Sequence, residues 1–224
     1  MSIPNIEVHN LAIQYTETGL GDAFDSVGVP LDFEVLFFDI DGGEYQMLNG
    51  LYPKYRPKFV CVEYDNAYPL SIDYIPREIR HGRQASSIAF FKMMRDKGYN
   101  LLKSFSNDHI FIDAFFAEEN SLSCPTFNEF VFRATENLYQ YDKIFLCQNP
   151  NRAGDGIAFL SSKLDALIED GFKEYAKSFY CEVARNATSC LGFLSSIGKR
   201  QDDYSKNLEV AICQFMKRYS SLID

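Results

Sequence analysis

Two short apolar runs in the first half of the chain each lead into an acidic residue. Residues 34–39 read Glu-Val-Leu-Phe-Phe-Asp, and residues 59–64 read Phe-Val-Cys-Val-Glu-Tyr. Runs of this length, rich in β-branched and aromatic residues, are typical of strands covered on both faces of a parallel sheet. Residues 45–51, which lie between them, carry apolar side chains at helical spacing. The pattern therefore predicts a strand-helix-strand unit.

The predicted unit places carboxylates at one edge of the sheet. Parallel strands end on the same side, so Asp39, Asp41 and Glu63 are expected at a common edge. Open α/β sheets bind their ligands at this edge, and a carboxylate there needs a hydrogen-bond partner, a cation or a ligand. These three residues are the first candidates for a functional site. One interpretation of Glu44 is a solvated acid in the first turn of the helix.

The pattern then predicts a loop, a helix and a hairpin. Residues 65–83 hold two prolines and several basic residues and are expected to form a loop. Residues 85–97 carry apolar side chains on one helical face, and Gly98 is a helix stop signal. Residues 100–105 and 109–116 are two further strand patterns joined by a turn sequence. The first half therefore predicts parallel units that end in an antiparallel hairpin.

After about residue 119 the pattern becomes mainly helical. Residues 126–139 predict a helix, residues 143–148 a strand and residues 149–156 a loop. Apolar residues then keep an i, i+3, i+4 rhythm over 160–183, and a last helix is expected over 208–219. These apolar stripes are interpreted as packing surfaces.

The predicted elements define an α/β fold. We expect a partial doubly wound sheet with a terminal antiparallel hairpin, followed by a mainly helical C-terminal region. The expected domains are residues 1–118, the partial α/β domain, and residues 119–224, the helical extension.

Charge and composition exclude several classes of partner. With 46% apolar residues in 224, the chain can bury a core. Its formal net charge of −9 repels nucleic acid and anionic membranes, so we expect neither as a partner. No apolar stretch approaches the ~18 residues of a membrane span, and the first residues do not read as a signal peptide. Six scattered cysteines lack zinc-site spacing, so we expect a cytoplasmic protein with reduced thiols and assign no metal ligand.

The sequence Asp39-x-Asp41-Gly42 resembles the first motif of the haloacid-dehalogenase-like phosphatases. In that family the first aspartate attacks phosphorus, the second acts as acid and base, and magnesium neutralises the charge. Gly43 departs from the family pattern, which places a threonine there. A Mg²⁺-dependent phosphatase is therefore the less favoured alternative.

A longer stretch fits a second pattern better. The pattern begins with an aspartate, an apolar residue, an acid and a glycine, which are followed by a glutamate and then by Leu-x-Gly. An Arg-Pro pair comes next and leads into a strand that ends in glutamate. The positions are Asp39, Asp41, Gly42, Glu44, Leu48, Gly50, Arg56, Pro57 and Glu63. Residues 85–87 at a helix start and residues 97–99 at its end also fit. Over about residues 15–118 the chain resembles the FkbM-type S-adenosylmethionine-dependent methyltransferases.

The resemblance implies a Rossmann-like methyltransferase fold and transfer of a methyl group from S-adenosylmethionine to a hydroxyl, on a sugar or another small polar acceptor. It implies that Asp39 and Gly42 border the cofactor. A carboxylate that accepts the hydroxyl proton is the ordinary general base, and the catalytic candidates are Asp39, Asp41 and Glu63. The candidate acceptor-binding residues are Tyr64, Asn66, Arg80 and His81.

In a Rossmann-like methyltransferase fold, the first strand-helix units hold the cofactor. The sequence pattern of this chain does not show these units. Only 38 residues precede Asp39, too few for two strand-helix units, and no Gly-x-Gly follows a strand there. The strand over 35–40 is therefore expected at an apolar sheet edge, covered by the C-terminal helices, by residues 143–148, or by a second copy or partner chain. The alternative function is a non-catalytic methyltransferase remnant that acts as a subunit or interaction module.

Overall fold

The structure is a computed structural model that describes residues 7–105, 107–126, 128–129, 155–196 and 203–223. The chain divides into two compact units. The sheet unit comprises Met1–Tyr64, Ile75–Ala85 and Ala89–Pro125. The helical unit comprises Asp65–Tyr74, Ser86–Ile88 and Thr126–Asp224. The helical unit therefore takes two short segments from the first half of the sequence.

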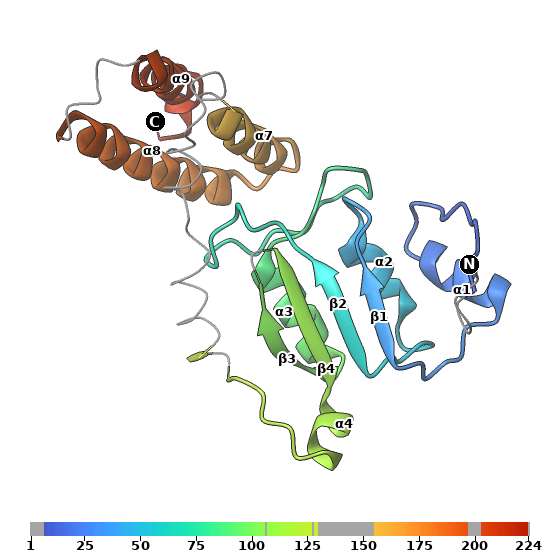
Figure 1. The fold of residues 1–224 in the computed structure, drawn as a ribbon. Coiled ribbons are helices and arrows are strands. Elements are labelled where there is room, and N and C mark those ends of the chain that lie inside the picture. Colours follow the sequence, from blue (N-terminus) through green and yellow to red (C-terminus); the bar gives the residue numbers. More distant parts are fainter. Residues whose placement is uncertain (1–6, 106, 127, 130–154, 197–202, 224) are drawn as a thin grey trace. The chain divides into compact units, whose positions relative to one another are not determined.

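The sheet unit is built on four strands in the order β1-β2-β4-β3 (Figure 1). The strands are β1 (Val35–Phe38), β2 (Phe59–Glu63), β3 (Tyr99–Ser104) and β4 (Asp108–Asp113). β1 and β2 are parallel, whereas β4 lies between β2 and β3 and is antiparallel to both. The predicted α/β class, the parallel pair and the terminal hairpin are confirmed.

Helices α2 (Glu44–Leu51) and α3 (Ser87–Asp96) lie on the same face of the sheet (Figure 1). Helix α1 (Gly19–Val27) contacts α2. The face toward α2 and α3 is apolar, and its buried side chains come from strands and helices alike: Leu36, Phe38, Val60, Val62, Phe111, Met47, Leu48, Phe90 and Met94. As expected, α3 is followed by Gly98, whose φ of 82° favours glycine and whose N–H donates to the carbonyl of Arg95.

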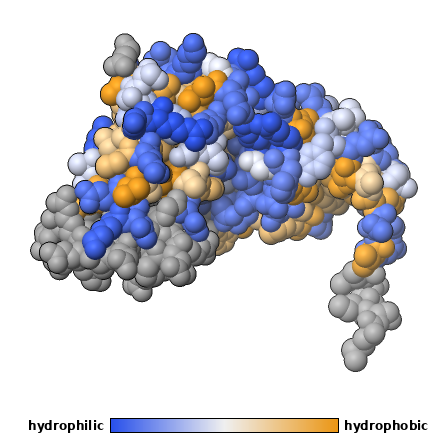
Figure 2. Space-filling model, turned by 90° about the horizontal axis from the view of Figure 1, so that it is seen from above, coloured by the Kyte–Doolittle hydropathy of each residue, from blue (hydrophilic) through white to orange (hydrophobic). Residues whose placement is uncertain are grey.

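The expectation that β1 is covered on both faces is wrong for the described residues. Leu36 and Phe38 are buried, but Val35 is 58% exposed and Phe37 is 70% exposed. Successive side chains of a strand point to opposite faces, and α2 and α3 cover only one of them. β1 is also the outermost strand of the described sheet. Exposed apolar side chains occur elsewhere too, and Figure 2 shows hydrophobic residues among hydrophilic ones on the surface seen from above.

The last predicted strand of this unit is too long by three residues. β4 ends at Asp113, and helix α4 (Ala114–Glu119) follows directly. The Asp113 carboxylate accepts the N–H of Phe116 at 2.9 Å. A carboxylate that caps the first turn stabilises a helix start, so the apolar residues after Asp113 enter a helix instead of continuing the strand.

The helical unit contains α7 (Asp155–Glu169), α8 (Lys173–Ser196), α9 (Asp203–Tyr219) and the short η3 (Ser220–Leu222). The apolar rhythm over 160–183 runs without a break, but the structure divides it into two helices at Gly171, whose φ is 80°. The N–H of Gly171 donates to Ile168 and that of Phe172 to Leu167. These bonds satisfy the last carbonyls of α7, so the apolar stripe continues on a new helix.

Two short segments from the first half of the chain belong to this unit's core. Tyr68 donates its hydroxyl to the carbonyl of Lys163 at 3.1 Å, and Tyr74 donates to Asp170 Oδ2 at 2.7 Å. Lys163 also pairs with Asp65 at 2.6 Å. Residues 65–74 therefore form the predicted loop, without helix or strand, and are anchored on α7.

Some expectations fall largely or wholly outside the described residues, namely the helix over 126–139, the strand over 143–148 and most of the loop over 149–156. Across the described ranges, every helix is too short or too polar to span a bilayer.

Candidate functional site

Three carboxylates meet at the carboxyl edge of the parallel strand pair. One carboxylate oxygen from each of Asp39, Asp41 and Glu63 lies within 4.8 Å of the others. Asp39 and Asp41 follow β1, and Glu63 closes β2 beside it. The prediction that these three carboxylates lie at a common edge of the sheet is confirmed. We call these three residues the acidic edge.

The loop that carries Asp39 and Asp41 makes an unusual turn. Asp41, Gly42 and Gly43 all have positive φ, at 57°, 132° and 94°. Such backbone favours glycine and tolerates aspartate better than most residues. A Cβ on Gly42 would overlap the carbonyl oxygen of Arg80, so glycine is required there. The turn directs the chain back into α2 while leaving both aspartates exposed.

Glu44 is buried beneath this loop, so the interpretation of it as a solvated acid is wrong. Its exposed fraction is 0%. Glu44 Oε1 accepts the N–H of Gly42 at 2.9 Å and that of Ile40 at 3.1 Å. Within the described part of the chain, Oε2 has no hydrogen-bond partner. Burial raises the pKa of Glu44, the two backbone donors lower it, and the charge of Asp39 raises it further.

Glu63 is half-buried and held by two amide side chains. Asn107 Nδ2 donates to Oε1 at 2.7 Å, and Gln84 donates to Oε2. Burial raises the pKa of Glu63, and the Asn107 bond opposes this rise. The charge of Asp39 raises the same pKa. The side chain is thus fixed in position and binds a proton more readily than an exposed glutamate.

A fourth carboxylate at this edge comes from the hairpin. β4 is antiparallel to β2, so its first residue, Asp108, pairs with Glu63 at the same edge. Burial and the charge of Asp39 both raise the pKa of Asp108. In the sequence, Asn107 and Asp108 belong to the turn between the strands predicted over 100–105 and 109–116. They reach the site because β4 pairs with β2. This pairing joins strands far apart in the sequence, so no local sequence pattern predicts it.

The predicted acceptor-binding residues fall in both units. Tyr64 is buried, its ring stacks on His109 at 4.0 Å between centroids, and its hydroxyl donates to Phe105 O. Burial raises its pKa. Asn66 belongs to the helical unit. The role of both residues in binding stays a prediction.

Arg80 and His81 are exposed and lie on a segment joined to the acidic loop. Gly82 donates its N–H to the carbonyl of Asp41, and Gly43 donates to the carbonyl of Arg83 at 3.3 Å. These main-chain bonds place the basic residues beside the turn that carries Asp39 and Asp41. Basic side chains can therefore border the acidic edge.

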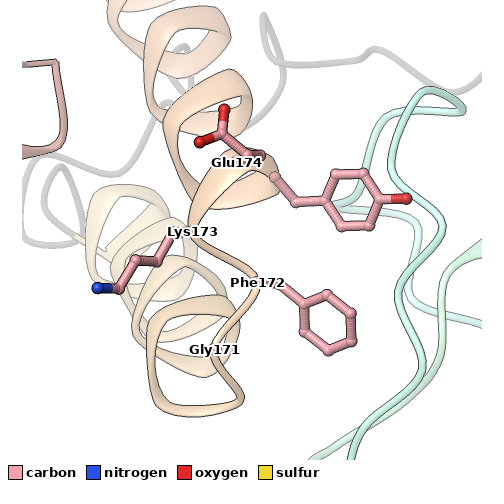
Figure 3. A pocket seen from close by; sticks show the side chains of 5 residues that line it. Gly171, Phe172, Lys173 and Glu174 are labelled. Atoms are coloured by element: carbon pink, nitrogen blue, oxygen red, sulfur yellow. The ribbon is translucent and has the colours of Figure 1, made fainter.

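A pocket of about 350 Å³ lies in the helical unit, at the turn between α7 and α8 (Figure 3). The rings of Phe172 and Tyr175 stack with 5.8 Å between their centroids, while Lys173 and Glu174 are exposed. Its lining residues are Gly171, Phe172, Lys173, Glu174 and Tyr175. The pocket offers an aromatic surface without a buried polar side chain among these residues, so we assign no chemistry to it.

Comparison of the chain with models of protein families, with curated proteins and with solved structures finds no match in any of the three.

Proposed function

We propose that this chain is a methyltransferase-type protein that takes part in O-methylation of a sugar or another small polar hydroxyl acceptor. S-adenosylmethionine is the methyl donor in this proposal. The observation that carries it is the convergence of Asp39, Asp41 and Glu63 at the carboxyl ends of two parallel strands. Ligands of open α/β sheets bind at this edge.

The arrangement of the sheet supports the proposal. A parallel pair, β1 and β2, is extended by a hairpin whose second strand, β4, inserts next to β2. A partial doubly wound sheet with a terminal antiparallel hairpin is the fold that the sequence resemblance implies. In this interpretation the acidic edge is the acceptor side of a larger site.

Glu63 is the residue best suited to accept the proton of the acceptor hydroxyl. Its raised pKa brings it closer to the working range of a general base near neutral pH. Asn107 and Gln84 hold the carboxylate in place, which reduces the cost of orienting it for proton transfer. The exposed Asp39 and Asp41 can accept hydrogen bonds from other hydroxyls of a sugar.

The described residues lack the close backbone approach that such a cofactor needs. Such a cofactor needs backbone that approaches it closely after a strand. Gly42 does not provide this, because its N–H donates to Glu44 and its α-carbon faces the carbonyl of Arg80. We therefore derive no methyl-transfer step from this chain alone. We propose instead that a second copy or a partner chain pairs with the outermost strand β1, covers the exposed side chains of Val35 and Phe37, and completes the cofactor site.

Calorimetric titration of the full chain with S-adenosylhomocysteine tests this proposal. Micromolar binding that strengthens as the chain self-associates is the expected result. The Glu63→Gln variant should keep that binding and lose methyl transfer to a hydroxyl acceptor. Asp96→Asn, at an exposed surface pair on α3, is the matched control. No binding at millimolar ligand would instead favour a non-catalytic subunit or interaction module.

The same three carboxylates keep the magnesium-dependent phosphatase as a second candidate, because Asp39 and Asp41 form an Asp-x-Asp pair directly after a strand. Release of phosphate from a phosphate ester would then require Mg²⁺ and be abolished by Asp39→Asn. Metal-independent release, or release that survives this change, would exclude that chemistry.

A further inference from the structure

Five carboxylates lie at or directly beneath one edge of the sheet. The acidic edge supplies three of them, Asp39, Asp41 and Glu63, with oxygens within 4.8 Å of one another. The charges of Glu44 and Asp108 interact with Asp39 as well. Like charges this close repel, and the cost rises where solvent is partly excluded. An arrangement of this kind is stable when a cation or a proton offsets the repulsion.

Glu44 provides a second, independent observation. Its side chain is fully buried under the loop between Asp39 and Asp41, where Oε1 accepts two backbone N–H groups. Oε2 has no hydrogen-bond partner within the described residues. The charge of this carboxylate also acts on Glu63. A buried carboxylate oxygen without a donor costs free energy unless a proton or a nearby cation stabilises it.

We propose that the acidic edge binds one divalent cation through Asp39, Asp41 and Glu63, with Glu44 contributing negative charge from below. The ligand atoms are all carboxylate oxygens, which suit hard cations such as Mg²⁺, Mn²⁺ and Ca²⁺. A cation at this position leaves open coordination sites toward solvent, because Asp39 and Asp41 are exposed. It can therefore bind a hydroxyl or phosphate oxygen of a ligand.

Asp41→Asn is the sharpest variant for a test. Asp41 has a φ of 57°, a conformation that asparagine adopts as readily as aspartate, so the loop is preserved. The change removes one negative charge and little else. Glu63→Gln is the second variant, because glutamine keeps an oxygen for one of the amide donors. Asp96→Asn is the matched control, since Asp96 is exposed and pairs with Arg95.

The experiment titrates the full chain with Mn²⁺ and follows free Mn²⁺ by electron paramagnetic resonance, with Mg²⁺ and Ca²⁺ as competitors. We expect one Mn²⁺ per chain, displaced by Mg²⁺. Asp41→Asn and Glu63→Gln should each weaken binding at least about tenfold, the effect of losing one charged ligand worth ~1.4 kcal/mol. Asp96→Asn should bind as the wild type does. Circular dichroism verifies that each variant is folded.

Thermal unfolding supplies a second readout. Without metal, Asp41→Asn should melt at the same or a higher temperature than the wild type, because it relieves repulsion. With metal, only the wild type and Asp96→Asn should gain stability. A variant that merely damaged the fold would melt lower in both conditions.

Three results would overturn the inference. One is the absence of Mn²⁺ binding at ~10 mM ion, beyond the ~1 mM of the weakest calcium modules. Mn²⁺ should fail to bind if the basic residues of the 80–83 segment already neutralise the carboxylates of the acidic edge. The others are binding that survives both edge variants, and binding that Asp96→Asn weakens equally. No S-adenosyl ligand is present, so the result is separate from that of the proposed function.

Discussion

Glu44 Oε1 accepts the backbone N–H of Gly42 at 2.9 Å, so a buried carboxylate closes the loop that presents Asp39 and Asp41 to solvent. The loop could not take this path with an apolar residue at position 44, because the N–H groups of Ile40 and Gly42 would lose their acceptor. Glu44 is thus both a structural support for the acidic edge and a source of its negative charge.

Glu44→Ala should destabilise the protein by about 3 kcal/mol, because two hydrogen bonds are lost and buried donors are left unsatisfied. Glu44→Gln keeps an acceptor oxygen and removes the buried charge, so it should cost much less. Urea unfolding measures both values. Equal losses for the two variants would show that the charge, and not the acceptor, holds the loop.

Stability at the acidic edge should depend on pH with a definite sign. Burial raises the pKa of Glu44 and of Glu63 in the folded chain. Each group then binds more protons when folded, so its stabilising contribution is complete below the unfolded pKa of ~4.3 and is lost as pH rises through the folded pKa. The free energy of unfolding should fall less steeply above pH 4 in Glu44→Gln than in the wild type. Unfolding curves recorded at several pH values make the comparison. The prediction is contradicted if the free energy of unfolding varies with pH in the same way in both proteins.

Neighbouring phenylalanines of β1 should respond differently to substitution. Phe38 is 5% exposed, so Phe38→Ala should cost ~3–5 kcal/mol. Phe37 is 70% exposed, so Phe37→Lys should change the stability of a monomer by no more than ~0.5 kcal/mol. If another chain covers Phe37, the wild type should associate in sedimentation as its concentration rises, and Phe37→Lys should abolish that association. A large loss of stability at high dilution would mean that Phe37 is buried within the monomer.

The ion pair between Lys163 and Asp65 should be among the stronger polar contacts of the helical unit. The side chains are 13% and 3% exposed and lie 2.6 Å apart. Removing one partner leaves the other charge buried, so Lys163→Met should cost roughly 3 kcal/mol. Arg95→Met, which breaks the exposed pair with Asp96, should cost less than ~1 kcal/mol. Chemical unfolding of both variants makes the comparison, and similar small losses would show that Lys163 reaches water.

The sequence was sufficient to predict the strands of the described sheet, the helix between β1 and β2, and the meeting of Asp39 with Glu63. These depend on apolar runs and on the rule that parallel strands end together. The burial of Glu44 was not predictable from its place in a first turn, because it depends on a loop with three positive φ values folding over it. Asp108 was missed for a similar reason, since its position requires β4 to lie beside β2.

The apolar rhythm misled in two places. It continues unbroken past Gly171, because α7 and α8 both present apolar faces to the same core, and only the positive φ of that glycine marks the turn. It also suggested that Phe37 and Phe38 are buried alike, whereas the sides of a strand differ when helices cover only one face. Periodicity reports which residues are apolar, and the arrangement of neighbouring elements decides which of them are covered.

The segment Asp65–Tyr74 limits how this protein can evolve by recombination. It lies in sequence between β2 and α3, yet its tyrosines and Ile72 are buried with residues of α7, α8 and α9. Each unit is therefore assembled from three separated stretches of chain. A single recombination breakpoint cannot exchange the helical unit for another domain, because the incoming helices would meet aromatic side chains shaped for different partners. The two units are bound to be inherited, and to diverge, together.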